Sequence, residues 1–233
     1  MKAHQNPVPD PARPGRAAIR VLLVDDHALL RDSLGRLLDS EDDLCVVGAA
    51  GNADDGVRLA RELSPDVLVL DIDLPGRLCF DATREILTLP RPPRVLYLSA
   101  FHHDRYIEEA LASGAAGYIT KDEPPDGLIR AIRKVHSGQI YFSERVRGRL
   151  IVEPDGSLRL GASGSTRASS LTPRELEVLR YLARGLSKKE IAKAMNRSYS
   201  TVDRHTENLM AKLDIHDRVE IARFAIREGL AEA

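Results

Sequence analysis

Five short apolar runs, each followed by a segment with helical spacing, constrain the fold of this chain more than any other feature of its sequence. The runs are rich in β-branched residues and have the length of buried strands. They lie at residues 21–24, 45–47, 67–70, 95–98 and 118–120, and the helical segments lie at 29–38, 57–63, 83–87, 106–111 and 128–135. A single run of this kind could be a buried turn of helix. Five in strict alternation predict a (βα)5 doubly wound parallel sheet with helices on both faces.

From residue 171 onward all the signals are helical. A Thr-x-x-Glu capping box at 172–175, with proline at its first helical position, and a Ser-x-x-Glu box at 187–190 mark two helix starts. Ser198 has the side chain of an N-cap for a third helix. The connections are short, as in a helix-turn-helix, although a generic helical bundle fits the same signals equally well. We therefore expect a second, all-α domain of four helices.

The composition changes at the N-terminus and between the two predicted domains. Residues 1–17 include four prolines and no apolar stretch, which is typical of a disordered tail and not of a signal peptide. The segment 161–170 is polar and rich in glycine and serine, as linkers are, and apolar runs on both sides of 154–156 favour a short β-hairpin before it. The predicted organisation is a tail at 1–17, an α/β domain at 18–138, a linker at 139–170 and a helical domain at 171–230.

The two predicted domains carry net charges of opposite sign. Residues 18–140 contain 14 Lys and Arg against 21 Asp and Glu, a net charge of −7, whereas residues 171–230 contain 12 against 9, a net charge of +3. The positive domain is therefore a candidate for binding a polyanion. No apolar run approaches membrane-spanning length, so no membrane partner is expected. Cys45 and Cys79 have neither metal-ligand spacing nor a disulfide framework, which favours a reducing, cytoplasmic location.

An acidic cluster is predicted at the carboxyl edge of the sheet. Asp25 and Asp26 follow the first strand, and Asp71 follows the third, so their carboxylates are expected to meet where parallel sheets bind ligands. Carboxylates about 4 Å apart repel by roughly 4 kcal/mol at an effective dielectric of 20, so a cation is expected among them, and ligation by oxygen alone favours Mg²⁺. Ser99 ends the fourth strand and Lys121 follows the fifth, which adds a hydroxyl and an ammonium to the same edge. These are the parts of a phosphoryl-transfer site, with Asp71 as nucleophile.

Residues 19–137 resemble a CheY-like receiver domain. The resemblance rests on the acidic pair at 25–26, the segment VLVLDIDLPG at 67–76, Ser99 before Ala100, and GYITK at 117–121. One departure lies beside the site, where this chain reads Arg-Leu-Cys-Phe at 77–80 instead of the short Asp-Gly step that is common in the family.

The resemblance implies a role for each of these residues. Asp71 is the expected phosphoacceptor, and Asp26 and Asp71 are expected Mg²⁺ ligands. Asp25 is expected to support the metal through water, and the main-chain carbonyl of Asp73 to complete the protein ligands. The remaining expected site residues are Lys121 and the switch pair Ser99 and Tyr118.

A second class of protein shares part of this pattern. Asp71 and Asp73 form an Asp-x-Asp pair like that of the haloacid-dehalogenase-like phosphatases, which also use an aspartyl nucleophile and Mg²⁺. In those enzymes the pair usually follows the first strand, whereas here an acidic pair and two βα units precede it. We therefore expect a regulator and not an enzyme. Multiple turnover of a phosphomonoester would favour the phosphatase.

Residues 171–230 resemble the LuxR-type helix-turn-helix of the NarL/FixJ response regulators. The matching segments are 171–179, 185–192, 200–205 and 208–213. The resemblance implies that double-stranded DNA is a partner, with Lys188 and Lys189 near phosphates and the third helix, 198–212, in the major groove. The last helix, 217–228, is implied to pair two domains on a two-fold DNA site, so a homodimer is expected when the protein is active.

The third helix of this domain carries both basic and acidic residues. Arg204 is the best candidate to read a base, because its guanidinium can bind guanine in bidentate fashion, and His205 is expected near the DNA backbone. Asp203 and Glu207 are unexpected, since carboxylates repel phosphates, although they could accept a hydrogen bond from cytosine. The full set of expected DNA-binding residues is Lys188, Lys189, Ser198, Tyr199, Ser200, Thr201, Asp203, Arg204, His205, Glu207 and Lys212.

Together the two resemblances predict a two-component response regulator in which a cognate histidine kinase phosphorylates Asp71 and so controls DNA binding and transcription. Two alternatives stay open at this stage. The chain could bind DNA independently of phosphorylation and use its first domain for dimerisation. It could also be a protein-interaction adaptor whose acidic third helix no longer binds DNA.

Overall fold

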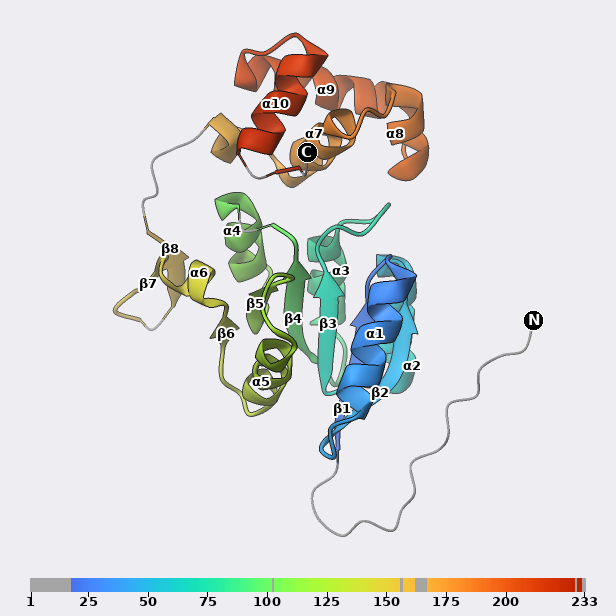
Figure 1. Cartoon of the computed structure of the whole chain (residues 1–233), viewed down its shortest axis with the longest axis vertical. Coiled ribbons are helices and arrows are strands. Elements are labelled where there is room, and N and C mark those ends of the chain that lie inside the picture. Colours follow the sequence, from blue (N-terminus) through green and yellow to red (C-terminus); the bar gives the residue numbers. More distant parts are fainter. Residues whose placement is uncertain (1–17, 102, 156, 162–166, 229, 232–233) are drawn as a thin grey trace, which may run out of the picture.

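The computed structural model describes residues 18–101, 103–155, 157–161, 167–228 and 230–231. The predicted tail at 1–17 lies outside these residues. The first half of the chain forms a parallel sheet with the strand order β2-β1-β3-β4-β5-β6 (Figure 1). Its strands are β1 (Ile19–Val24), β2 (Leu44–Ala50), β3 (Val67–Asp71), β4 (Arg94–Ser99), β5 (Gly117–Thr120) and β6 (Tyr141–Phe142).

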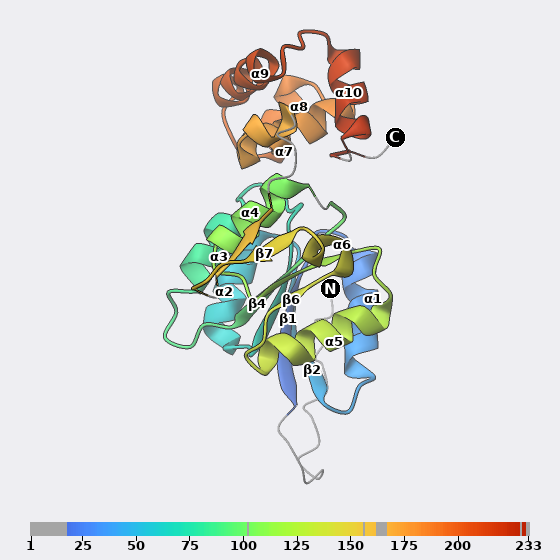
Figure 2. The ribbon, with the colours of Figure 1, turned by 90° about the vertical axis from the view of Figure 1, so that its left-hand side faces the viewer.

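Helices cover both faces of this sheet, as the alternation of patterns predicted. Figure 2 shows α1 and α5 on one face and α2, α3 and α4 on the other. Along β1, Val21 and Leu23 pack on the side of α1 and α5, whereas Leu22 and Val24 pack on the opposite side. The helices are α1 (Ala28–Asp39), α2 (Ala53–Leu63), α3 (Cys79–Ile86), α4 (Asp104–Ala112) and α5 (Pro125–His136).

The sixth strand was not predicted. Two residues are too few to show a strand pattern, and β6 is held by its backbone, because the Tyr141 N–H donates to the Ala116 carbonyl (3.0 Å) and the Ser143 N–H to the Tyr118 carbonyl (3.0 Å). The chain continues through α6 (Glu144–Arg147) into an antiparallel hairpin, β7 (Leu150–Val152) and β8 (Leu158–Leu160), in the segment where the sequence favoured one. The hairpin contacts α4, and between α6 and β7 Arg149 lies 2.5 Å from the carboxylate of Asp104.

The second half of the chain is helical. After the 3₁₀ helix η1 (Arg167–Ser170) it consists of α7 (Pro173–Ala183), α8 (Lys188–Ala194), α9 (Tyr199–Leu213) and α10 (Arg218–Arg227). Both predicted capping boxes are confirmed at the starts of α7 and α8, and the Ser198 side chain caps α9. The helical domain lies over the carboxyl ends of the strands (Figure 1). None of the described helices is long and apolar enough to cross a bilayer.

Candidate phosphorylation site and DNA-binding surface

Three charged side chains from three strands meet at the carboxyl edge of the sheet. Asp25 follows β1, Asp71 ends β3 and Lys121 follows β5. The Lys121 Nζ lies 2.8 Å from Oδ2 of Asp25 and 2.8 Å from Oδ2 of Asp71. Both carboxylates are buried, with Asp71 1% and Asp25 3% exposed. The sheet register thus brings together residues that are up to 96 positions apart in the sequence.

The environment of this group sets its protonation. Burial raises the pKa of Asp71 to about 6, with the Asp25 carboxylate acting in the same direction and Lys121 opposing it. Burial lowers the pKa of Lys121, but the neighbouring carboxylates of Asp71 and Asp25 outweigh burial and the pKa is raised overall. At neutral pH the pair therefore consists mostly of an ammonium and a carboxylate whose oxygen can act as a nucleophile.

The same edge offers ligands for a cation, namely three carboxylates and one imidazole. Ligand atoms of Asp25, Asp26, His27 and Asp71 lie within 4.8 Å of one another. The exposed Asp26 is 2.8 Å from the Nδ1 atom of His27. Three carboxylates in this arrangement fit Mg²⁺, which prefers oxygen ligands and retains several waters.

Asp73 lies next to this set, but its carboxylate belongs to a different contact. Its backbone N–H donates to Oδ1 of Asp71 (3.0 Å), while its carboxylate forms ion pairs with Arg180 and with Arg184, the latter at 3.0 Å. The resemblance to receiver domains implied a metal contact only for the main-chain carbonyl of Asp73, so the ion pairs of its side chain are an additional finding.

Ser99 and Tyr118 both bond to the backbone of one residue, Phe101. The Phe101 N–H donates to Oγ of Ser99 (3.0 Å), and the Tyr118 hydroxyl donates to the Phe101 carbonyl (2.5 Å). All three side chains are buried, and burial raises the pKa of Tyr118, so its hydroxyl is neutral and can donate this hydrogen bond. The two residues expected to form the switch pair therefore hydrogen-bond to a common backbone segment, which the sequence did not reveal.

The loop after β3, which departs from the family pattern at residues 77–80, leads into α3. Gly76 has a φ of +85°, and the residues after it lead directly into α3, where Cys79 and Phe80 are buried. Arg77 turns back and lies 2.7 Å from Glu85 of α3. The Gly76 carbonyl accepts a hydrogen bond from Arg174 of α7 (2.9 Å), so this loop is also where the helical domain contacts the sheet domain.

Three arginines that contact this loop were not predicted, two in α7 and one, Arg184, at its C-cap. Arg174, Arg180 and Arg184 each reach residues between Asp73 and Gly76. One signal could have identified Arg180, because it lies four residues after Leu176 on the apolar face of the helix, where a buried arginine requires a partner.

The expected DNA-binding residues cluster at the start of α9 and near α8. Tyr199 is 49% exposed, and Lys189, Ser200, Arg204 and Glu207 are also exposed. The Ser198 hydroxyl bonds to the hydroxyls of its neighbours Ser200 and Thr201 at the helix start. His205 is partly buried, and both burial and the adjacent arginine lower its pKa.

Two of the lysines expected among the DNA-binding residues are engaged within the domain. The Lys188 Nζ lies 2.5 Å from the carboxylate of Asp203, and the Lys212 Nζ lies 2.7 Å from that of Glu175, the capping-box residue of α7. Asp203 is therefore neutralised by a neighbouring lysine and does not present a free negative charge to DNA. Among the acidic residues expected in α9 to meet DNA, Glu207 keeps an exposed carboxylate.

Comparison with known protein families gives two matches. Residues 21–133 match the family described as response regulator receiver domain, and residues 169–225 match the family of bacterial regulatory proteins, luxR family. Among curated proteins, the transcriptional regulatory protein LiaR of Bacillus subtilis is 34% identical, with 91% of this chain and 99% of LiaR covered. The nitrate/nitrite response regulator NarL of Escherichia coli is 32% identical, with 90% of this chain and 96% of NarL covered.

Solved structures give the same result for the fold. A two-component response regulator of the LuxR family from Aurantimonas is 32% identical, with a TM-score of 0.54, and the match covers 57% of this chain and 94% of that chain. RcsB of Salmonella, bound to the promoter P1flhDC with a phosphomimetic, has a TM-score of 0.64 at 22% identity, with 89% and 98% covered. The similarity to RcsB is evidence for the fold alone.

Proposed function

Because this chain belongs to the response regulators that join a receiver domain to a LuxR-type DNA-binding domain, we propose that phosphorylation of Asp71 by a histidine kinase controls DNA binding by α7–α10. The observation that carries this proposal is the position of Lys121, whose Nζ lies 2.8 Å from both Asp71 and Asp25. A nucleophilic carboxylate beside a fixed ammonium suits phosphoryl transfer. An aspartate that only capped a helix would not require the ammonium.

The chemistry follows from these atoms. A carboxylate oxygen of Asp71 attacks the phosphorus of a phosphohistidine or of acetyl phosphate, the bond from phosphorus to the donor breaks, and the donor leaves with the bonding electrons. Lys121 stabilises the charge on the phosphoryl oxygens, because its ammonium already lies at the nucleophile. One phosphoryl group is transferred to each chain.

Asp25, Asp26 and Asp71 would hold Mg²⁺, and the carbonyl of Asp73 would complete the protein ligands. When bound, the metal would neutralise charge on the phosphoryl oxygens. Within the chain, the Asp73 N–H orients Asp71 by donating to its Oδ1 (3.0 Å), so the other oxygen, Oδ2, faces Lys121.

Ser99 and Tyr118 would relay the new charge. A phosphoryl group on Asp71 offers strong acceptors to the Ser99 hydroxyl. If the serine side chain rotates toward the phosphoryl group, the Phe101 N–H loses its acceptor, Oγ of Ser99. Since Tyr118 bonds to the carbonyl of the same residue, both switch residues displace one segment, the start of the β4–α4 loop.

At the DNA, Arg204 would read a base edge, and the exposed residues around it would contact the backbone. The exposed Lys189 and the hydroxyls of Ser198 and Ser200 suit phosphate contacts at the start of α8 and α9. Val219 is 65% and Ile226 41% exposed on α10, and pairing of this helix between two chains on a two-fold site would cover them.

Two of the alternatives lose support. A phosphatase of the haloacid-dehalogenase type needs its second aspartate at the reaction centre, whereas the carboxylate of Asp73 is engaged by two arginines. An adaptor with an acidic third helix is less favoured because Lys188 neutralises Asp203. Phosphorylation-independent DNA binding predicts that a phosphodonor which labels Asp71 leaves the DNA affinity unchanged.

The test of the phosphoacceptor is covalent labelling. The full-length chain is incubated with acetyl phosphate and Mg²⁺, and the phosphorylated residue is identified after reductive trapping and peptide mass analysis. We expect label on Asp71 and none in Asp71→Asn, while the matched control Asp126→Asn, an exposed change in α5, labels normally. Label that persists in Asp71→Asn would refute the assignment.

A further inference from the structure

His27 adds a nitrogen ligand to the carboxylates at the carboxyl edge of the sheet. One ligand atom each of Asp25, Asp26, His27 and Asp71 lies within 4.8 Å of the others, and that of His27 is an imidazole nitrogen. Mg²⁺ prefers oxygen ligands, so its binding needs only the carboxylates and leaves the imidazole without a role. Imidazole is instead a good ligand for divalent transition-metal ions.

The distances around His27 fit adjacent ligands of one ion. Its Nδ1 atom lies 2.8 Å from Oδ1 of Asp26 and 3.4 Å from Oδ1 of Asp25. Neighbouring ligands on an octahedral divalent ion are about 3 Å apart when each bond to the ion is about 2.1 Å long. The Nδ1 atom therefore has, relative to each of these two carboxylate oxygens, nearly the spacing that adjacent ligands require.

The two oxygens of Asp25 face different partners. The backbone N–H of His27 donates to Oδ1 of Asp25 (2.8 Å), whereas the Nζ atom of Lys121 lies 2.8 Å from Oδ2. Lys121 also lies 2.8 Å from Oδ2 of Asp71. A cation held by Oδ1 of Asp25 and the imidazole therefore does not compete with Lys121 for the same oxygen of Asp25.

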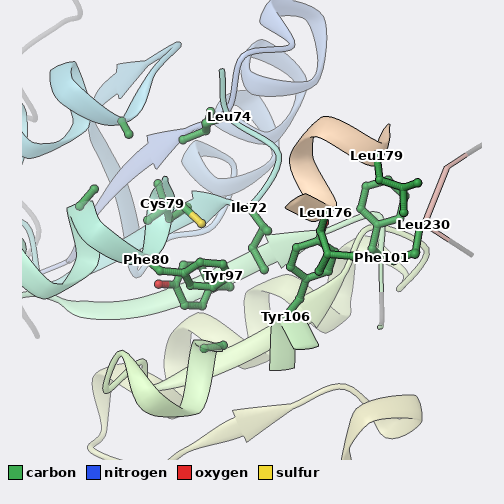
Figure 3. Close-up of a cluster of buried hydrophobic side chains, with 14 of the residues drawn as sticks. Ile72, Leu74, Cys79, Phe80, Tyr97, Phe101, Tyr106, Leu176, Leu179 and Leu230 are labelled. Atoms are coloured by element: carbon green, nitrogen blue, oxygen red, sulfur yellow. The ribbon is translucent and has the colours of Figure 1, made fainter. Parts of the chain in front are cut away.

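The site opens to solvent on the side of His27. Asp71 is 1% exposed, whereas the side chain of His27 is 65% exposed. The residues after Asp71 close the site toward the core, since Ile72, Leu74 and Cys79 belong to the buried apolar cluster shown in Figure 3. An ion that enters from solvent therefore meets the imidazole before it reaches the buried carboxylates.

The fold of α1 does not explain why this residue is a histidine. His27 is the N-cap residue of α1, but its side chain makes no capping hydrogen bond. Serine, threonine, aspartate and asparagine are the residues preferred at such a position, because their side chains bond to the first backbone N–H groups of the helix. The neighbours that its Nδ1 atom does approach are the carboxylates of Asp25 and Asp26.

We propose that His27 is a ligand through which the phosphorylation site binds divalent transition-metal ions that accept imidazole, the class of Fe²⁺, Co²⁺ and Zn²⁺, more tightly than Mg²⁺. The inference rests on the proposed function, because it concerns the same metal site. The carboxylates of Asp25, Asp26 and Asp71 serve both kinds of ion. The preference between them depends on His27, because an imidazole nitrogen stabilises these ions more than it stabilises Mg²⁺.

The test measures metal binding by the full-length chain without an affinity tag. Isothermal titration calorimetry gives the dissociation constants of Mg²⁺ and of Co²⁺ for the wild type, His27→Ala and Asp71→Asn, and the visible absorption of Co²⁺ reports its ligands independently. Since the side chain of His27 is exposed and makes no capping hydrogen bond, His27→Ala keeps the fold. The matched control is His136→Ala, an exposed change at the end of α5.

We expect His27→Ala to weaken binding of Co²⁺ by about tenfold or more relative to binding of Mg²⁺, and to shift the absorption bands of Co²⁺, whereas His136→Ala changes neither. Asp71→Asn should weaken binding of both ions, because they share the site. An unchanged ratio of the two constants in His27→Ala, or Co²⁺ binding that Asp71→Asn leaves intact, would overturn the proposal. Labelling of Asp71 by acetyl phosphate with Mg²⁺ tests the proposed function alone, so the two proposals fail separately.

Discussion

The receiver site and the recognition helix differ in what fixes their side chains. At the receiver site each charged residue stands at the end of a strand, and the sheet register forces Asp25, Asp71 and Lys121 together. On α9 the polar residues project from one helix into solvent, where Asp203 pairs with Lys188 of the neighbouring helix. Long-range backbone geometry therefore determines the first site, and local side-chain pairing determines the second.

The largest effect should come from removing the ammonium of the receiver site. Lys121→Met leaves the phosphoryl oxygens without their fixed cation, so the rate of labelling by acetyl phosphate should fall by about 100-fold or more. Lys134→Met, an exposed change in α5, is the matched control and should leave the rate unchanged. If Lys121→Met is labelled at nearly the wild-type rate, phosphoryl transfer does not depend on the contact of Lys121 with Asp71 and Asp25.

Arg204→Ala tests whether the recognition helix reads sequence. Loss of a bidentate base contact should reduce discrimination between the preferred site and a one-base variant by about 1–3 kcal/mol, because phosphate contacts do not distinguish bases. The measurement is a pair of dissociation constants on DNA selected from genomic fragments. Equal loss of affinity for both DNAs would instead make Arg204 a backbone contact.

Ser99→Ala tests the buried hydrogen bonds of the receiver. The Phe101 N–H loses its acceptor in a buried environment, so the free energy of unfolding should fall by about 1–3 kcal/mol in urea denaturation. Ser33→Ala is the control, since the hydroxyl of this exposed α1 residue donates to the Leu29 carbonyl. An unchanged stability of Ser99→Ala would mean that the Phe101 N–H finds another acceptor.

The smallest effect is expected at the ion pair of the DNA-binding domain. Asp203→Asn frees Lys188 for a phosphate, so affinity for all DNA sequences should rise by a small factor. The slope of log affinity against log salt concentration should become steeper by the equivalent of about one phosphate contact. Glu207→Gln removes the same charge from α9 without releasing Lys188 and should leave the slope unchanged. The same slope in Asp203→Asn and in the wild type would show that Lys188 does not reach phosphate.

The sequence predicted the features that depend on backbone periodicity and strand order, and it missed features that depend on individual contacts. The alternating sheet, the capping boxes and the convergence of Asp25, Asp71 and Lys121 were predictable because periodicity and strand order act over many residues. Strand β6 was missed because two residues show no period, and its pairing depends on the backbone of β5. The ion pairs of Asp73 with Arg180 and Arg184 were missed because their formation depends on how two domains dock, which no local pattern records.

The central claim is that phosphorylation of Asp71 controls DNA binding, and the most direct test measures DNA affinity with and without a phosphodonor. Electrophoretic binding of the full-length chain to selected genomic fragments is compared in the presence and absence of acetyl phosphate and Mg²⁺, for the wild type and for Asp71→Asn. We predict that the donor changes the affinity of the wild type by about tenfold or more and leaves the affinity of Asp71→Asn unchanged. An equal response of both chains, or no response of the wild type once labelling is verified, would contradict the account.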